Sequence, residues 1–247
     1  MSFEVYTDCI FRSFAAHPKQ QEILKRKNEI INEIAGFHNF TPDTVLYIGF
    51  NPAILNDPAS ELYVTAISDE VKDYLSAHDL KFTYIPYAEL KNYVKFFDSV
   101  ISLDEFFTFA SDDLEQKNKI ELISSLTKEY FITTCKDYKN QEFKDREFSV
   151  PALIRNSKNK IIYLEFHDYD PKDKNLWQTE VFEIDNNVLN TYGPFYRRAL
   201  FFKQLAKFTS DAGAIGFTVH KNLMYKSLIK KNYEHVISIR FDNYGYK

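Results

Sequence analysis

Apolar residues follow two different spacings along this chain, and the change from one to the other marks its structural elements. Short apolar runs without a helical period occur at residues 45–50, 62–67, 82–87, 98–103 and 130–135. Apolar residues recur at helical spacing over residues 18–35, 68–75 and 111–126. Strands that alternate with helices in this way predict right-handed βαβ units and a mostly parallel sheet.

The ends of the predicted helices carry capping residues. Ser68 stands before Asp69 and Glu70, and a Ser-Asp pair at 111–112 precedes the third helical segment, so side chains can accept hydrogen bonds from the first turns. Gly36 is expected to end the first helix. Residues 1–17 show no clear period, and their aromatic side chains fit either a lid or an anchored terminus.

The pattern changes after residue 136. Residues 136–149 are polar and predict a loop, and residues 161–166 and 177–184 predict two strands of a hairpin joined by a charged turn. A helix over 195–212 and closing strands at 217–220 and 235–241 follow. We predict one α/β domain over residues 1–247, with an N-terminal helical segment at 1–40 and a strand-rich cap insertion at about 150–190.

Composition narrows the class of protein. The 247 residues are 45% hydrophobic, enough for a sizeable core, and 31 basic against 35 acidic residues give a net charge of −4. This charge argues against broad binding of duplex DNA, although a local basic patch is compatible with it. Two cysteines are too few for a disulfide framework, and no apolar run approaches the roughly 18 residues of a membrane span. We expect a soluble, cytoplasmic protein that does not bind membranes.

The stretch from Val45 to Ala53 is the strongest candidate for a ligand loop. Its apolar run enters Gly49 and then turns through Asn51 and Pro52. A glycine lets the backbone approach a ligand closely and adopts positive φ at low cost. In an open parallel sheet, ligands bind beyond the carboxyl ends of the strands. If residues 45–50 form the first strand of such a sheet, residues 49–53 form the floor of the site.

The order of elements over roughly residues 43–241 resembles a class I S-adenosylmethionine-dependent methyltransferase. Residues 45–53 are similar to its glycine-rich first loop, and residues 63–75 to its second strand and the following helix. Residues 97–105 are similar to its fourth strand, and residues 208–217 to its late helix-to-strand junction. The resemblance implies a Rossmann-like, mostly parallel sheet of order 3-2-1-4-5, with flanking helices, late antiparallel strands and a small strand-rich cap.

The resemblance also implies S-adenosylmethionine as cofactor and assigns its contacts. The backbone from Gly49 through Phe50 to Asn51 would meet the methionine part, and Ser68 or Asp69 the ribose hydroxyls. The adenine edge would meet Tyr87, Ala88 and Glu89 at the end of the third strand. The boundary between cofactor and substrate would be lined by Leu103, Asp104 and Glu105 at the end of the fourth strand. The acceptor would be a small or medium-sized molecule, because the predicted hairpin resembles a substrate cap.

Several residues admit a purely structural explanation. Ser68 and its acidic neighbours are also a complete helix cap, and Asp104 with Glu105 could be a solvated strand end. His167, near the predicted cap, is a candidate general base. Carboxylates and histidine alternate at Glu165, His167, Asp168 and Asp170, but this spacing is typical of a solvated strand edge, so no metal site is predicted.

The first loop departs from the family pattern. Tyr47 stands where the family has an acid, Asn51 and Ala53 stand where glycines are expected, and Ser68 replaces or displaces the ribose acid. Two functions therefore remain open. One is S-adenosylmethionine-dependent methyl transfer, with the acceptor atom undecided. The other is a non-catalytic Rossmann-like binding or partner protein that has lost the cofactor. The sequence does not indicate an oligomeric state.

Overall fold

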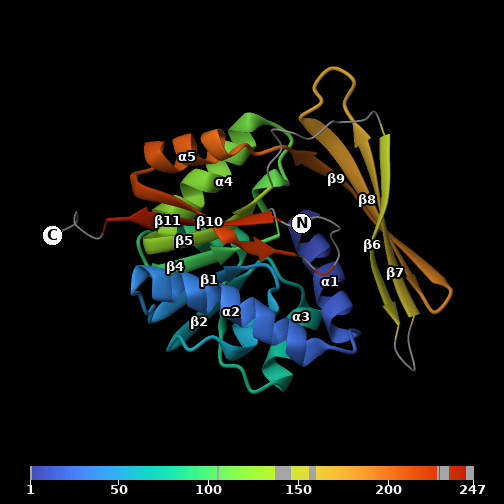
Figure 1. Ribbon diagram of the computed structural model, residues 1–247, viewed down its shortest axis with the longest axis horizontal. Helices are drawn as coiled ribbons and strands as arrows, with labels where there is room; N and C mark the ends of the chain where they lie inside the picture. Colours follow the sequence, from blue (N-terminus) through green and yellow to red (C-terminus); the bar gives the residue numbers. More distant parts are fainter. Residues whose placement is uncertain are drawn as a thin grey trace.

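A computed structural model provides the fold. It describes residues 2–104, 106–136, 146–155, 160–226, 228 and 234–242. This part of the chain contains two sheets, one of seven strands and one of four (Figure 1). Among the described residues, no helix is long and apolar enough to cross a membrane.

The larger sheet has the strand order β10-β11-β5-β4-β1-β2-β3. Its first five strands in sequence are parallel to one another, β11 is antiparallel to β5, and β10 is antiparallel to β11. The predicted order 3-2-1-4-5 with late antiparallel strands is therefore confirmed. The strands are β1 (Thr44–Ile48), β2 (Glu61–Thr65), β3 (Thr83–Tyr84), β4 (Phe97–Ser102), β5 (Thr127–Cys135), β10 (Ala214–Tyr225) and β11 (Glu234–Phe241).

Helices join and cover these strands. Ser68 caps α3 by accepting a hydrogen bond from the Val71 amide at 3.4 Å, and Asp112 caps α4 through the Glu115 amide at 2.8 Å. Both predicted caps are confirmed. The α-helices are α1 (Ser2–Ala15), α2 (Gln20–His38), α3 (Asp69–Ala77), α4 (Asp113–Leu126) and α5 (Phe202–Asp211). Short 3₁₀ helices form at η1 (Pro52–Asn56), η2 (Tyr87–Asn92) and η3 (Phe106–Thr108).

The smaller sheet is fully antiparallel and lies beside the larger one, with α1 between them (Figure 1). It consists of β6 (Arg146–Arg155), β7 (Lys160–Tyr169), β8 (Leu176–Asp185) and β9 (Val188–Arg198). Along β8 the buried residues Trp177, Thr179, Val181 and Glu183 alternate with exposed or half-buried ones. One face of this sheet therefore packs against the body of the protein.

Residues 2–15 form α1, within the helical segment predicted at 1–40. Three expectations about the element boundaries were wrong. Helix α2 continues past Gly36, where a Cβ would meet nothing within 4 Å, and ends at His38, with Asn39 as its C-cap at φ 49°. The third strand has only two residues. Residues 146–149 of the predicted loop belong to β6, and residues 137–145 lie outside the described part.

The cap is larger than predicted, with four strands over residues 146–198 where a hairpin at about 150–190 was expected. Residues 195–198 were assigned to a helix but complete β9. Phe195 and Arg197 are buried and Tyr196 is exposed, so burial follows the period of two that a strand imposes. The helix α5 starts only at Phe202.

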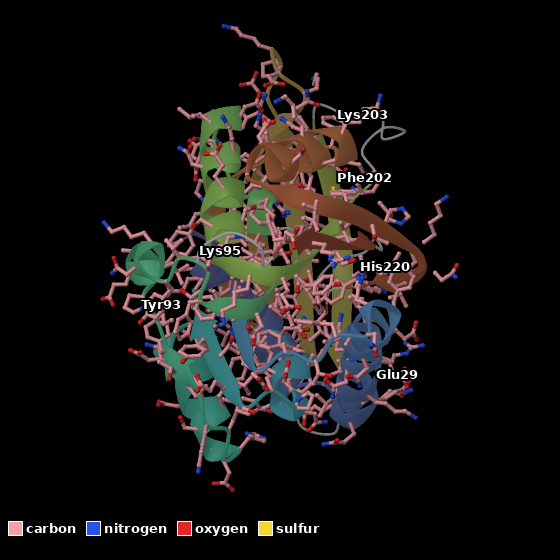
Figure 2. All side chains as sticks on the ribbon, turned by 90° about the vertical axis from the view of Figure 1, so that its left-hand side faces the viewer. Glu29, Tyr93, Lys95, Phe202, Lys203 and His220 are labelled. Atoms are coloured by element: carbon pink, nitrogen blue, oxygen red, sulfur yellow. The ribbon has the colours of Figure 1, made fainter. Side chains whose placement is uncertain are left out.

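Side chains also tie the amino ends of the strands together. Lys95 (Figure 2) takes a positive φ of 49° in the turn before β4, and its Nζ donates a hydrogen bond to the Thr127 carbonyl at the start of β5. Asp98 in β4 accepts hydrogen bonds from the Thr44 amide at 3.0 Å and from Lys128 Nζ at 2.9 Å. These contacts lie at the end of the sheet opposite to the predicted ligand loop.

Candidate functional site

The candidate site lies where β1, β2 and β4 end side by side. Gly49 follows β1 directly with φ +78°, and its amide donates to the Thr65 carbonyl at 2.9 Å. The apolar strand therefore passes into a turn that favours glycine, as predicted. A Cβ placed on Gly49 would stand 2.6 Å from Thr7 Cγ2 and 2.8 Å from Phe3 Cε1, so the missing side chain also makes room for α1.

A buried chain of hydrogen bonds crosses the strand ends. The Tyr225 hydroxyl donates to Asp104 Oδ2 at 2.6 Å and accepts from Asn51 Nδ2 at 2.9 Å. Asn51 Oδ1 in turn accepts from the Ala53 amide at 2.9 Å and caps η1. Burial, together with the Asp104 carboxyl, raises the pKa of Tyr225 well above its usual value, so the phenol stays protonated and remains a donor.

One carboxylate oxygen of Asp104 has no hydrogen-bond donor among the described residues. The atom is Oδ1, and the residue is only 2% exposed and takes a positive φ of 62°. A buried carboxylate oxygen without a donor is costly, because the group has given up its water. This oxygen is therefore an acceptor available to a ligand that brings an ammonium or hydroxyl donor to the strand ends.

Helix α1 fills the space in front of these groups. Phe3, Thr7 and Ile10 line it from one side, and Ile48, Phe50, Asn51, Ile101, Leu103 and Asp104 from the other. What remains between these side chains does not hold a water molecule. The Thr7 hydroxyl lies 2.7 Å from the Glu4 carbonyl of its own helix and 3.2 Å from the Ala66 carbonyl just beyond β2, and its single proton can be donated to either acceptor.

The second half of α1 is held by the strand ends, by α3 and by the cap. Phe11 and Phe14 pack against Phe50, with ring centroids 5.3 and 5.8 Å apart, and both also contact Tyr74 of α3. The Arg12 guanidinium contacts Glu183 of the cap at 3.1 Å. Burial alone would raise the pKa of Glu183, but Arg12 and the surrounding donors lower it overall, so this carboxylate stays charged.

The remaining predicted contacts lie around this site rather than in it. Ser68 is engaged in capping α3, while Asp69 is exposed and pairs with Lys72 at 2.6 Å. In η2, Ala88 and Glu89 are exposed, and Tyr87 contacts Phe106 at a centroid distance of 5.9 Å. Burial raises the pKa of Tyr87 to about 12. Glu105 lies outside the described residues.

His167 lies away from the strand ends, on β7 of the cap. Its Nδ1 is 2.9 Å from Thr179 Oγ1, and its Nε2 is 3.5 Å from Glu165 Oε2. These partners belong to the same sheet, so the structure does not bring His167 together with Gly49 or Asp104. Within the described ranges, no group of three or more histidine, cysteine, aspartate or glutamate side chains could hold a metal ion.

Sequence reasoning missed the residues that α1 and β10 contribute. Phe3, Tyr6, Ile10 and Phe14 recur at helical spacing, which would have indicated a buried helix face. Nothing in the sequence points to Thr7, whose methyl group occupies the position of a Gly49 side chain. Tyr225 is 174 residues from Asn51 in sequence, and only the folded sheet brings them together.

The fold is that of class I S-adenosylmethionine-dependent methyltransferases. A methyltransferase from Clostridium acetobutylicum ATCC 824 superposes with a TM-score of 0.64 at 13% identity, over 88% of this chain and 92% of its own. The sugar N-methyltransferase KedS8 from Streptoalloteichus gives 0.64 at 8% identity, over 89% and 88%. No family model matches the sequence, and no curated protein matches it significantly.

A third structure extends the likeness almost to the full length of both chains. CalS10 from Micromonospora echinaspora, an amino pentose methyltransferase with S-adenosylmethionine bound, gives a TM-score of 0.59 at 9% identity, over 97% of this chain and 98% of its own. These superpositions show a common fold, which includes the cap. At identities this low they do not show which ligand this chain binds, so the ligand has to be inferred from the residues of this chain.

An adenosyl cofactor does not fit these strand ends while α1 is docked. A ligand of that size usually needs a cavity of about 300–1,000 Å³. Here Phe3 and Thr7 occupy the place beside Gly49, and the Thr7 hydroxyl stands 3.2 Å from the Ala66 carbonyl. The Gly49 backbone and the free oxygen of Asp104 suit such a ligand, but α1 would have to leave them first.

Proposed function

We propose that this chain transfers a methyl group from S-adenosylmethionine to a small or medium-sized acceptor. The fold supports the reaction class, because the likeness to methyltransferases includes both the parallel sheet and the strand-rich cap. Two of the similar structures are described as sugar and amino pentose methyltransferases, which supports a small molecule as acceptor. In this account, the strand ends bind the cofactor and the cap contributes to the acceptor site.

The observation that carries the proposal is that Gly49 and the unpartnered oxygen of Asp104 both lie at the strand ends. Both lie where neighbouring parallel strands end, the position at which open α/β sheets bind ligands. Gly49 offers a backbone without a side chain, and Asp104 Oδ1 is a buried acceptor without a donor among the described residues. A ligand that carries an ammonium group or ribose hydroxyls would satisfy this oxygen.

Calorimetry with S-adenosylhomocysteine tests the proposal on three forms of the full chain. These are the wild type, Asp104→Asn, and Phe14→Ala, which loosens α1 without changing a residue that lines the site. We expect binding that Asp104→Asn weakens about tenfold or more, since a charged hydrogen bond is worth roughly 1.5–3 kcal/mol. Absence of heat from folded wild type and folded Phe14→Ala at millimolar ligand would contradict the proposal.

The second candidate is a non-catalytic partner protein with a methyltransferase fold. One observation favours it: between Phe3, Thr7 and Ile10 of α1 and the described residues of the strand ends that they face, the remaining space does not hold a water molecule. In that case α1 would be a permanent part of the core. The same calorimetry separates the two candidates, because a permanent core helix predicts no adenosyl binding even after Phe14→Ala.

A further inference from the structure

We propose that α1 is an intramolecular occupant of the cofactor site, so that docking of α1 and binding of an adenosyl ligand exclude one another. The inference rests on the proposed function and adds a regulatory element to it. A lid would cover a ligand and leave a cavity beneath itself. Helix α1 instead puts side chains into the site, where Thr7 Cγ2 and Phe3 Cε1 lie within 2.8 Å of the position that a Gly49 Cβ would take.

Polar groups of α1 also lie where contacts to a ligand were expected. The Thr7 hydroxyl, 2.7 Å from the Glu4 carbonyl of its own helix, is also 3.2 Å from the Ala66 carbonyl, in the loop after β2 where the ribose of a cofactor was expected. Asp8 lies near Ser68, the other predicted ribose contact; its burial raises its pKa, while Ser68 acts in the opposite direction. No described residue of α1 satisfies Asp104 Oδ1, so the helix occupies the site without using its strongest acceptor.

The contacts that hold α1 extend beyond the site. Phe14 packs on Phe50 and Tyr74 without lining the pocket, and Arg12 joins α1 to Glu183 of the cap and to Glu70 of α3. Docking of α1 can therefore be weakened at a distance from the ligand. If only the undocked state binds, the apparent dissociation constant equals the intrinsic constant divided by the undocked fraction. A substitution that loosens α1 must then tighten binding.

The experiment combines calorimetry with hydrogen exchange, using S-adenosylhomocysteine as the probe. Phe14→Ala is compared with wild type and with Phe241→Ala, since both phenylalanines are 2% exposed but Phe241 contacts Lys95 rather than α1. We expect Phe14→Ala to raise the apparent affinity at least about tenfold, and Phe241→Ala to leave it within about twofold. Amides of residues 2–15 should exchange faster in the ligand complex than in the free protein.

Slower exchange of residues 2–15 on binding would overturn the inference and identify α1 as a lid, while the proposed function would stand. The inference would also be overturned if Phe14→Ala accelerated exchange of α1 but left the affinity unchanged. If Phe14→Ala does not fold, Phe14→Leu replaces it, and the wild-type exchange data decide independently. If a folded variant whose α1 amides exchange freely gives no binding heat, the proposed function itself would be overturned.

Discussion

Gly49 serves two purposes that substitutions can separate. It adopts φ +78°, and it leaves the space that Thr7 and Phe3 enter. We expect Gly49→Ala to lower the free energy of unfolding by about 1–3 kcal/mol, because positive φ is costly for a residue with a Cβ and the new methyl group meets α1. Urea denaturation measures the change.

Gly213 is the matched control for this prediction. It has φ +91°, but a Cβ there would meet nothing within 4 Å. Gly213→Ala therefore reports the backbone cost alone and should be the milder substitution. Combining Gly49→Ala with Thr7→Ser should recover part of the loss, because serine lacks the methyl group that stands in the way. Equal losses at both glycines, with no recovery, would show that α1 does not press on Gly49.

Tyr225 links residues from three elements through one hydroxyl. We expect Tyr225→Phe to destabilise the protein by about 1–3 kcal/mol, because both oxygens of the buried Asp104 carboxyl would then lack a donor among the described residues. Tyr74→Phe is the control, since the contacts described for Tyr74 are made by its ring and its backbone. Chemical denaturation of both variants tests this, and equal stabilities would contradict the assigned hydrogen bond.

Individual site residues could be predicted only where a local pattern marked them. Gly49 and Asp104 stand at the ends of apolar runs, and the structure places both at the strand ends. The hydrogen bonds of Asn51 depend on Tyr225, and the space before Gly49 depends on Thr7, so no local pattern contains that information. The candidate base His167 was expected near the cap and lies there, on β7, while its role as a base stays a prediction.

Asp98 holds the amino ends of three neighbouring strands together. Burial alone would raise its pKa, but hydrogen bonds from Lys128 and Thr44 lower it overall. A carboxyl with a lowered pKa in the folded state adds stability above its unfolded pKa of about 3.9, and this contribution is lost as the pH falls through the folded value. Stability should therefore decline in acid, below about pH 4.

We expect Asp98→Asn to lose about 1–2 kcal/mol of unfolding free energy at pH 7, and the difference from wild type to shrink below about pH 4. Urea denaturation at several pH values measures this dependence. Asp69→Asn should change little at any pH, because Asp69 pairs with Lys72 on the surface. A pH-independent effect of Asp98→Asn would rule out its charge as the cause.

The elements that the sequence predicted best are those with a single clear period. The parallel strands of the first half and the two helix caps were recovered, because buried strands and capped helices leave local patterns. The order of the strands came from the resemblance to the methyltransferase family. Helix α1 was predicted only as part of an N-terminal helical segment, because the helical spacing of its buried aromatic and aliphatic residues was not recognised. The last four residues of β9 were assigned to the following helix because their alternation includes the buried Arg197, an unusual residue for an inward-facing position.

Helix α1 contacts both the cap and the segment that follows β4. Tyr6 contacts Phe195 of the cap at a centroid distance of 6.1 Å and Phe109 beyond β4 at 4.9 Å, while Arg12 reaches Glu183. Helix α1 therefore lies between the strand ends and the cap (Figure 1). Movement of α1 would affect both positions together.

The charge of the chain as a whole predicts its behaviour toward nucleic acid. With a net charge of −4, we expect no salt-sensitive binding of duplex DNA at physiological ionic strength, because such binding depends on neutralising phosphates with basic side chains. Fluorescence anisotropy with random-sequence duplex at increasing salt tests this. Sub-micromolar binding that weakens steeply with salt would contradict it.

A crystal structure of the full chain grown with saturating S-adenosylhomocysteine tests the central claim most directly. We predict the amino-acid end of the ligand against Gly49–Asn51, its ribose near Ser68 or Asp69, and Phe3 and Thr7 withdrawn from the strand ends. A structure in which α1 keeps its place against Gly49 while the strand ends hold no ligand, or in which the ligand binds elsewhere, would contradict the account.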